Sequence, residues 1–217
     1  MRTAAFIDCE ATLTDHEVVH CPVLLRESLD GLRPSSGATI VDATLGPGGH
    51  AEALLELVGP AGRVIGIDRD PASIALARER LARFGERFVA FQGDHRDIVA
   101  LLHAADIVLV DAVLADLGIS SWQLDDPQRG FSFSADGPLD MRMDPAAGGP
   151  SAADLVATLQ ASELRDIIAT WGEERLAGRI ARAIVRERAK HPIVTTAALS
   201  WVRANAERYG IDPDFFR

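Results

Sequence analysis

Short apolar runs alternate with helical patterns along the first half of the chain. Four of these runs predict buried strands, at residues 38–41, 63–67, 88–91 and within 107–115. Between the strands, apolar residues recur every three or four positions, as in the helix that Pro71 begins behind an expected N-cap at Asp70. Strands that alternate with helices form parallel sheets. The fold class is therefore predicted as α/β, with a doubly wound, Rossmann-like sheet.

The pattern changes after Leu117. Residues 118–150 are rich in glycine, proline, aspartate and serine, and they are too many for an ordinary connector, which predicts a functional loop system. Residues 151–207 show amphipathic helical patterns. Ser151 begins an expected capping box, and Ser162 is the expected cap of the following helix.

Composition narrows the class of protein. The 217 residues are 47% hydrophobic and 25% charged, as in folded globular proteins, and they allow one domain with an appendage. The longest apolar run, 107–117, contains two aspartates and is too short to cross a bilayer, so we expect no membrane contact. Acidic residues near the N-terminus argue against a signal peptide. Only two cysteines, Cys9 and Cys21, favour a reducing, cytoplasmic location.

The charge is distributed unevenly. The net charge of −10 argues against a nonspecific nucleic-acid binder. Residues 1–120 hold 10 basic and 18 acidic residues, whereas residues 121–217 hold 12 and 14, so the second half could present a local basic face. The candidate for this basic face is a row of arginines at helical spacing within 174–190: Arg175, Arg179, Arg182 and Arg186. This arginine row either contacts RNA phosphates or is an ordinary solvated helix face.

A glycine-rich loop follows the first predicted strand and opens a helix. Its pattern, Gly46-x-Gly48-x-x-Ala51, fits a dinucleotide fingerprint, and Asp68 ends the next strand, where a carboxylate can accept hydrogen bonds from ribose hydroxyls. A nicotinamide dinucleotide and S-adenosylmethionine both suit this arrangement. Asp42 beside the loop favours the second, because it would repel a pyrophosphate but help to hold a cationic methionine end. The alternative is that Asp42 only caps the turn.

A second acidic position lies near the fourth predicted strand. Ligands of open α/β sheets bind outside the carboxyl ends of the strands, where Asp116 is the best-placed acid. The alternative for Asp116 is a plain strand-end cap. If the strand spans 107–110, Asp111 marks its end instead.

Nine motifs then occur in a particular order. They are residues 20–25, 41–50, 66–71, 116–121, 123–127, 129–133, 136–144, 172–175 and 179–184. Together they resemble the ribosomal RNA small subunit methyltransferase H family, over about residues 20–200. The run Gly-Pro-Leu-Asp-Met-Arg-Met-Asp at 137–144 is the most specific. This family methylates the exocyclic amino group (N4) of one cytidine in 16S rRNA.

The resemblance implies two domains, a cofactor-binding α/β domain at 20–140 and a helical insertion for substrate recognition at 141–210. It implies S-adenosylmethionine as cofactor, no metal, and 16S rRNA of the small ribosomal subunit as partner; a homodimer is a further candidate assembly. The implied cofactor contacts are Gly48, Gly49, His50, Asp68, His95, Asp116 and Gln123. Asp116, with Ser120 and Ser121, would accept hydrogen bonds from the reacting amine. His95 would stack on adenine, or be an ordinary surface histidine.

The resemblance also exposes a difference in length. Family members continue beyond residue 217 with further strands, which implies an incomplete sheet and a C-terminally truncated member. Two function classes therefore follow: an active rRNA methyltransferase, or a truncated, non-catalytic relative that only binds cofactor or ribosome. A nicotinamide-dependent dehydrogenase is a distant third.

Overall fold

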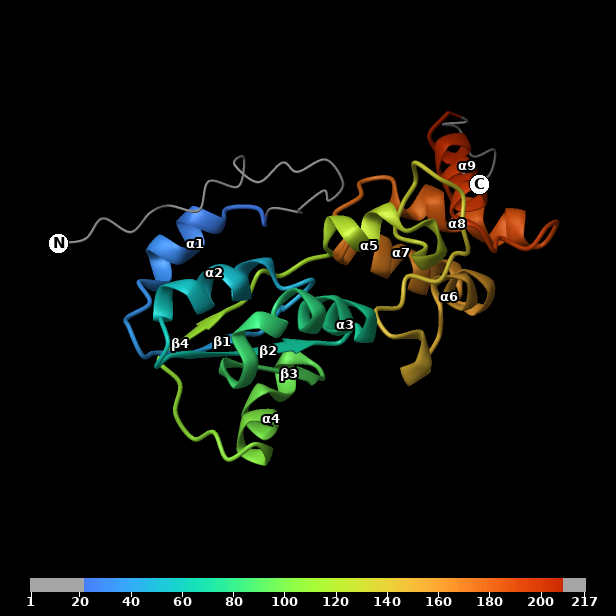
Figure 1. The fold of residues 1–217 in the computed structure, drawn as a ribbon. Coiled ribbons are helices and arrows are strands. Elements are labelled where there is room, and N and C mark those ends of the chain that lie inside the picture. The colour runs from blue at the N-terminus through green and yellow to red at the C-terminus, as the bar shows by residue number, and fades with distance from the viewer. Residues whose placement is uncertain (1–21, 209–217) are drawn as a thin grey trace, which may run out of the picture. The chain divides into compact units, whose positions relative to one another are not determined.

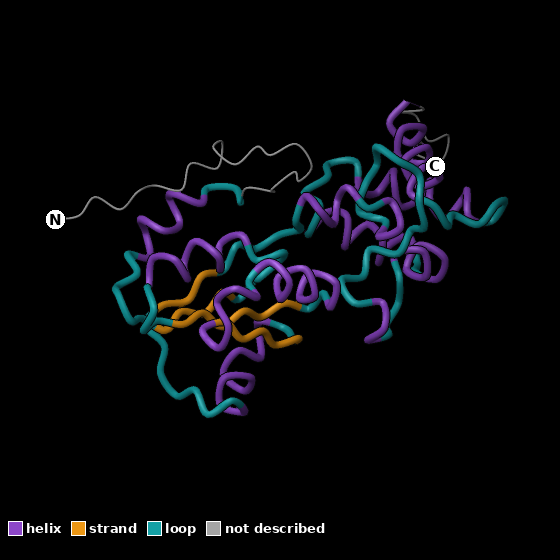
Figure 2. Tube along the Cα trace, in the orientation of Figure 1, coloured by secondary structure: helices purple, strands orange, loops and turns teal. Residues whose placement is uncertain are grey.

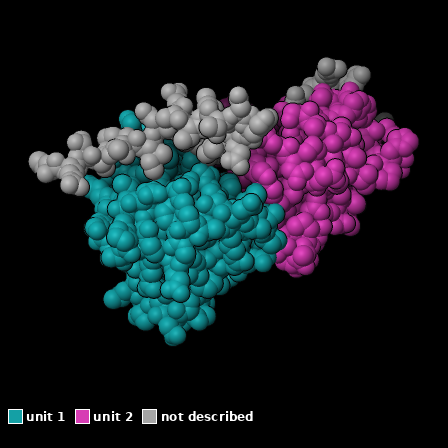
Figure 3. All heavy atoms as spheres, in the orientation of Figure 1, with its two compact units in different colours: residues 1–118 teal, residues 119–217 magenta. Residues whose placement is uncertain are grey.

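The computed structural model describes residues 22–208. The predictions for the N-terminal segment, the two cysteines and the tail 209–217 lie outside the described residues. The chain divides into two compact units, 1–118 and 119–217 (Figure 3). This division falls after residue 118, whereas the sequence predicts a domain boundary after residue 140. Residues 119–140 belong with the helices because Leu139 is buried in the helical core and its N–H donates to the carbonyl of Val194.

The first unit is built from four strands and four α-helices in the described residues (Figure 1). In chain order they are α1 Leu25–Leu32, β1 Thr39–Asp42, α2 Gly49–Val58, β2 Arg63–Asp68, α3 Pro71–Arg80, β3 Phe88–Gln92, α4 Ile98–Ala104 and β4 Ala112–Leu114. The strand order is β3-β2-β1-β4 and every pair is parallel. The strands, orange in Figure 2, form one sheet with helices on both sides of it. The predicted α/β fold class with a parallel, Rossmann-like sheet is confirmed.

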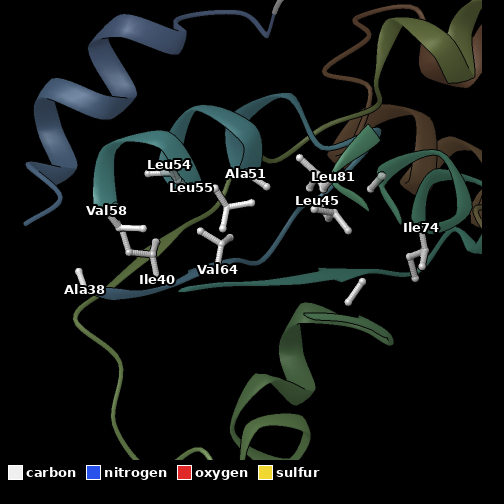
Figure 4. Close-up of a cluster of buried hydrophobic side chains, with 12 residues drawn as sticks. Ala38, Ile40, Leu45, Ala51, Leu54, Leu55, Val58, Val64, Ile74 and Leu81 are labelled. Atoms are coloured by element: carbon white, nitrogen blue, oxygen red, sulfur yellow. The ribbon is translucent and has the colours of Figure 1, made fainter. Parts of the chain in front are cut away.

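The two central strands, β1 and β2, bury both of their faces, as in a doubly wound sheet. Ile40 and Val64 face α2 and α3 in the core drawn in Figure 4. The alternate residues Val41 and Ile65 pack on the opposite face with Leu102 of α4. β1 lies between β2 and β4, and its carboxyl end leads directly into the glycine loop.

The fourth strand is shorter than the apolar run that predicted it. Val108 and Leu109 lie before β4 and are 77% and 83% exposed. Asp111 stands at the beginning of the strand, where its carboxylate accepts the N–H of Thr39 at 2.7 Å. Asp116, rather than Asp111, therefore follows the carboxyl end of β4.

The second unit is helical in the part of it that the structure describes. Its α-helices are α5 Ser121–Asp125, α6 Ala152–Thr158, α7 Ala161–Thr170, α8 Ala177–Arg188 and α9 Thr196–Arg208. The predicted capping box at the start of α6 is confirmed, since Ser151 and Asp154 bond reciprocally. Ser162 is not the cap of α7, because the helix begins one residue earlier; the backbone N–H of Gln160 donates to Glu163 instead.

Neither a membrane-spanning helix nor a metal-binding cluster occurs in the described residues. No helix among residues 22–208 has the length and apolar character that crossing a bilayer demands. Within the same range, no group of histidine, cysteine, aspartate and glutamate side chains is arranged to hold a metal ion.

Candidate cofactor site in the sheet unit

The glycine loop between β1 and α2 depends on backbone that only glycine adopts easily. Gly46 and Gly48 have φ of 51° and 87°. A Cβ on Gly48 would lie 3.2 Å from Cβ of Ala77 and 3.1 Å from Leu81, so α3 packs directly against this turn. The loop thus brings bare backbone to the carboxyl edge of the sheet, next to the first turn of α2.

We expect Gly48→Ala to lower the free energy of unfolding by about 2–3 kcal/mol, because it combines strained backbone with a tight contact on α3. Gly46→Ala is the matched control, since Gly46 also has positive φ but nothing lies within 4 Å of the position that a Cβ would take there. It should cost only about 1 kcal/mol. Urea unfolding of both variants measures the difference, and equal losses would contradict the contact with α3.

Asp42, the last residue of β1, is completely buried. Its Oδ1 accepts the N–H of Thr44 at 3.2 Å, whereas its Oδ2 has no hydrogen-bond partner among the described residues. Burial, together with the nearby carboxylates of Asp68 and Asp116, raises the pKa of Asp42 to about 7. Asp42 does cap the turn, but one of its oxygens is left over for another role.

Asp68 ends β2 and is bonded to the glycine loop. Its two oxygens accept the N–H groups of Gly46 at 2.7 Å and Asp70 at 2.8 Å. Burial raises the pKa of Asp68, while these backbone hydrogen bonds oppose the rise. The predicted ribose-binding residue therefore also holds the glycine loop in place.

Asp116, which follows β4, lies beside the loop between β1 and α2. Its backbone N–H donates to the hydroxyl of Thr44 at 2.7 Å, and its carboxylate lies 4.0 Å from Nδ1 of His50. The Asp116 side chain is 58% exposed, while His50 is buried and its Nε2 has no partner in the described part of the chain. Burial lowers the pKa of His50, against the effect of Asp116, so the imidazole is held neutral.

His95 lies in a 3₁₀ turn directly after β3. Its Nδ1 is 3.8 Å from the carboxylate of Asp94, and its side chain is 44% exposed. Asp94 also pairs with Arg96 at 2.7 Å and with Arg69 at 3.7 Å; the Arg96 hydrogen bonds hold the pKa of Asp94 well below its usual range. This exposed imidazole fits both of the sequence-based alternatives.

The first unit therefore holds six of the seven predicted cofactor residues, each at the carboxyl end of a strand or in the loop or first helical turn that follows it: Gly48, Gly49, His50, Asp68, His95 and Asp116. Gln123 belongs to the second unit. It is buried there, and its side-chain oxygen accepts the N–H of Ser120, whose hydroxyl accepts the N–H of Gln123 in return. Both residues thus cap α5.

Sequence reasoning missed Thr44 and Asp94. Thr44 connects residues 72 positions apart through its bond to Asp116. Asp94 forms ion pairs with two arginines, Arg69 and Arg96, next to His95. A partial signal existed for the first, since an aspartate in a turn commonly accepts the backbone N–H two residues further on, which here is that of Thr44. Its partner could not be known without the strand order.

The predicted arginine row lies on exposed positions in the second unit. Arg175 precedes α8, whereas the other three lie on the helix opposite its buried residues, among them Ile180 and Ile184. Glu187 pairs with Arg186 at 3.4 Å and with Lys190 at 3.0 Å. The row is thus partly neutralised at its C-terminal end.

A parallel sheet whose central strand ends in a glycine loop, with carboxylates after three neighbouring strands, defines a cofactor-binding α/β protein. Residues 17–208 match the model of the MraW methylase family. The chain belongs to this family. A nicotinamide-dependent dehydrogenase is therefore no longer a candidate.

Curated relatives agree with this assignment. The chain is 52% identical over 184 residues to "Ribosomal RNA small subunit methyltransferase H" of Trichlorobacter lovleyi, covering 85% of this chain and 58% of the relative. The protein of the same name from Beutenbergia cavernae is 53% identical over 180 residues, covering 81% and 53%. The chain thus spans a little over half the length of these relatives.

Among solved structures, a SAM-dependent O-methyltransferase from Thermotoga maritima is 24% identical, with a TM-score of 0.35, over 45% of this chain and 37% of that one. The family assignment does not depend on this partial match.

Proposed function

We propose that the chain takes part in S-adenosylmethionine-dependent methylation of the exocyclic amine, N4, of a cytidine in 16S rRNA. The observation that carries the proposal is the position of Asp116, a partly exposed carboxylate beside the glycine loop in a chain of the MraW methylase family. The names of the curated relatives supply the substrate class.

The residues present fit the cofactor. Gly48 and Gly49 would contact its methionine part through their backbone. Oδ2 of the buried Asp42 has no hydrogen-bond partner among the described residues and would be available to a cationic group of the ligand. Asp68 would accept the ribose hydroxyls and His95 would lie against the adenine. For Gln123 the family resemblance is the only support.

When bound, S-adenosylmethionine supplies an electrophilic methyl group on a sulfonium. The amine of cytosine is a poor nucleophile, because its lone pair is delocalised into the ring. Asp116 would accept an N–H hydrogen bond from that amine, orient it and return electron density to the nitrogen. Thr44 fixes the backbone of Asp116, and neutral His50 lies behind its carboxylate, so the acceptor is held by the glycine loop itself.

Two measurements test the proposal. Calorimetry with S-adenosylmethionine measures binding, and transfer of a labelled methyl group to unmethylated small ribosomal subunits measures activity. We expect binding and a single modified cytidine. Binding without transfer would instead favour the non-catalytic relative, and no binding would overturn the proposal.

The arginine row on and before α8 is the proposed rRNA contact. Replacing Arg179 and Arg182 by glutamine should weaken binding of 16S rRNA and reduce the slope of log affinity against log salt by about 1–2, because up to two phosphate contacts are lost. Arg165→Gln is the matched control, since this arginine pairs with the adjacent Asp166. An unchanged slope would mean that the row is an ordinary solvated helix face.

We also propose that the chain acts in the cytoplasm, where small ribosomal subunits are assembled. A homodimer stays a prediction that sedimentation velocity can test.

A further inference from the structure

The carboxyl group of Asp42 is in an unusual state for a strand-end aspartate. It is completely buried, and only one of its two oxygens has a hydrogen-bond partner among the described residues, the N–H of Thr44. A buried ionised carboxylate normally needs a cation or several hydrogen bonds to offset its lost hydration. Asp42 has one hydrogen bond.

The charged groups near Asp42 further disfavour its ionised form. Asp68, at the end of β2, and Asp116, after β4, are both acids and repel a negative charge on β1. The titratable group at the start of α2 is His50, which burial keeps neutral. No positive charge in this set compensates Asp42, and its raised pKa, about 7, agrees with that geometry.

We propose that Asp42 carries a proton in the ligand-free chain and releases it when a positively charged ligand group takes its place, so that cofactor binding is coupled to proton release. The inference rests on the proposed function, because it takes S-adenosylmethionine as the cationic ligand. Below about pH 7, where the ligand's α-amino group stays protonated, the carboxylic acid becomes a carboxylate, the proton passes to the buffer, and the ligand keeps its own charge.

The exchange makes use of the unpartnered oxygen. Neutral Asp42 tolerates burial, whereas ionised Asp42 forms an ion pair with a ligand cation in a site shielded from water. Ligands without a cation gain nothing from ionising it. Affinity for the cationic ligand should therefore rise with pH until Asp42 is already ionised in the free chain, at about pH 7.

Calorimetry in buffers of different ionisation enthalpy measures the exchange directly. A pKa of about 7 predicts release of about 0.9 proton per S-adenosylmethionine at about pH 6, where the ligand's own α-amino group is protonated. The net release should fall as the pH rises, because Asp42 in the free chain and the α-amino group of the free ligand then lose their protons. Asp42→Asn should abolish this release, whereas Asp106→Asn, which removes an exposed acid in the same unit, should keep it. Methylthioadenosine, which lacks both cationic groups, should bind without release.

Titration of the Asp42 carboxyl carbon by NMR in the ligand-free wild type supplies a test that needs no variant. A midpoint near 7 supports the proposal, and a midpoint near 4 overturns it. Binding of S-adenosylmethionine without proton release overturns the exchange alone. No binding overturns the exchange together with the proposed function.

Discussion

Asp116→Ala is expected to reduce methyl transfer to small ribosomal subunits at least 100-fold, the usual scale for removing a group that stabilises a transition state. The loss follows from the position of the carboxylate, which lies after β4 and 4.0 Å from His50. The backbone of residue 116 stays tied to Thr44 in the variant, because that bond uses the main-chain N–H. The fold should therefore survive. Single-turnover incorporation of labelled methyl groups measures the effect.

Asp111 offers the matched control, since it lies at the opposite end of the same strand. Asp111→Asn removes the same charge and keeps an oxygen that can accept the N–H of Thr39, so turnover should stay near that of the wild type. Asp116→Asn keeps an acceptor oxygen at the critical end and should retain more activity than Asp116→Ala. Near-normal turnover of Asp116→Ala would contradict the assignment.

The parts of the fold that could be predicted are those that local sequence determines. Asp70 and Pro71 specify the start of α3 within four residues, and the side chain of Asp70 does accept the N–H of Ala72. The glycine loop could also be predicted, because backbone with positive φ strongly favours glycine. The length of β4 could not be predicted as well. Val108 and Leu109 have strand-like side chains, but the backbone hydrogen bonds to β1 begin only at Asp111.

The properties of the site depend on contacts between distant residues and could not be predicted in the same way. Asp42 was expected to matter for its charge. Its burial and the approach of Asp68 and Asp116 require the strand order β2-β1-β4, and together they favour the uncharged form. Asp68 was expected to face a ligand, but Gly46 already bonds one of its oxygens. A motif thus identifies the residues of a site, whereas the packing decides their protonation.

The same buried carboxyl predicts an unusual pH dependence of stability. Asp42 has an ordinary pKa of 3.8 and a folded-state pKa of about 7, so the folded chain binds the proton more tightly than the unfolded chain does. This contribution to stability is fully present below about pH 4 and is lost as the pH rises through about 7. The shift corresponds to about 4 kcal/mol at most. Without ligand, the first unit, which contains the sheet, should therefore melt at a markedly lower temperature at about pH 8 than at about pH 5.

Asp42→Asn should remove most of that dependence, because asparagine resembles the protonated acid and cannot ionise. At about pH 8 the variant should melt on the order of 10 °C above the wild type, measured by circular dichroism without ligand. All three tryptophans lie in the second unit, at Trp122, Trp171 and Trp201, so their fluorescence reports separately on the helices. Parallel melting curves for wild type and variant across this pH range would mean that Asp42 is ionised in the folded chain. A variant that is more stable yet binds S-adenosylmethionine less tightly would show that the buried acid is retained for binding, at the expense of stability.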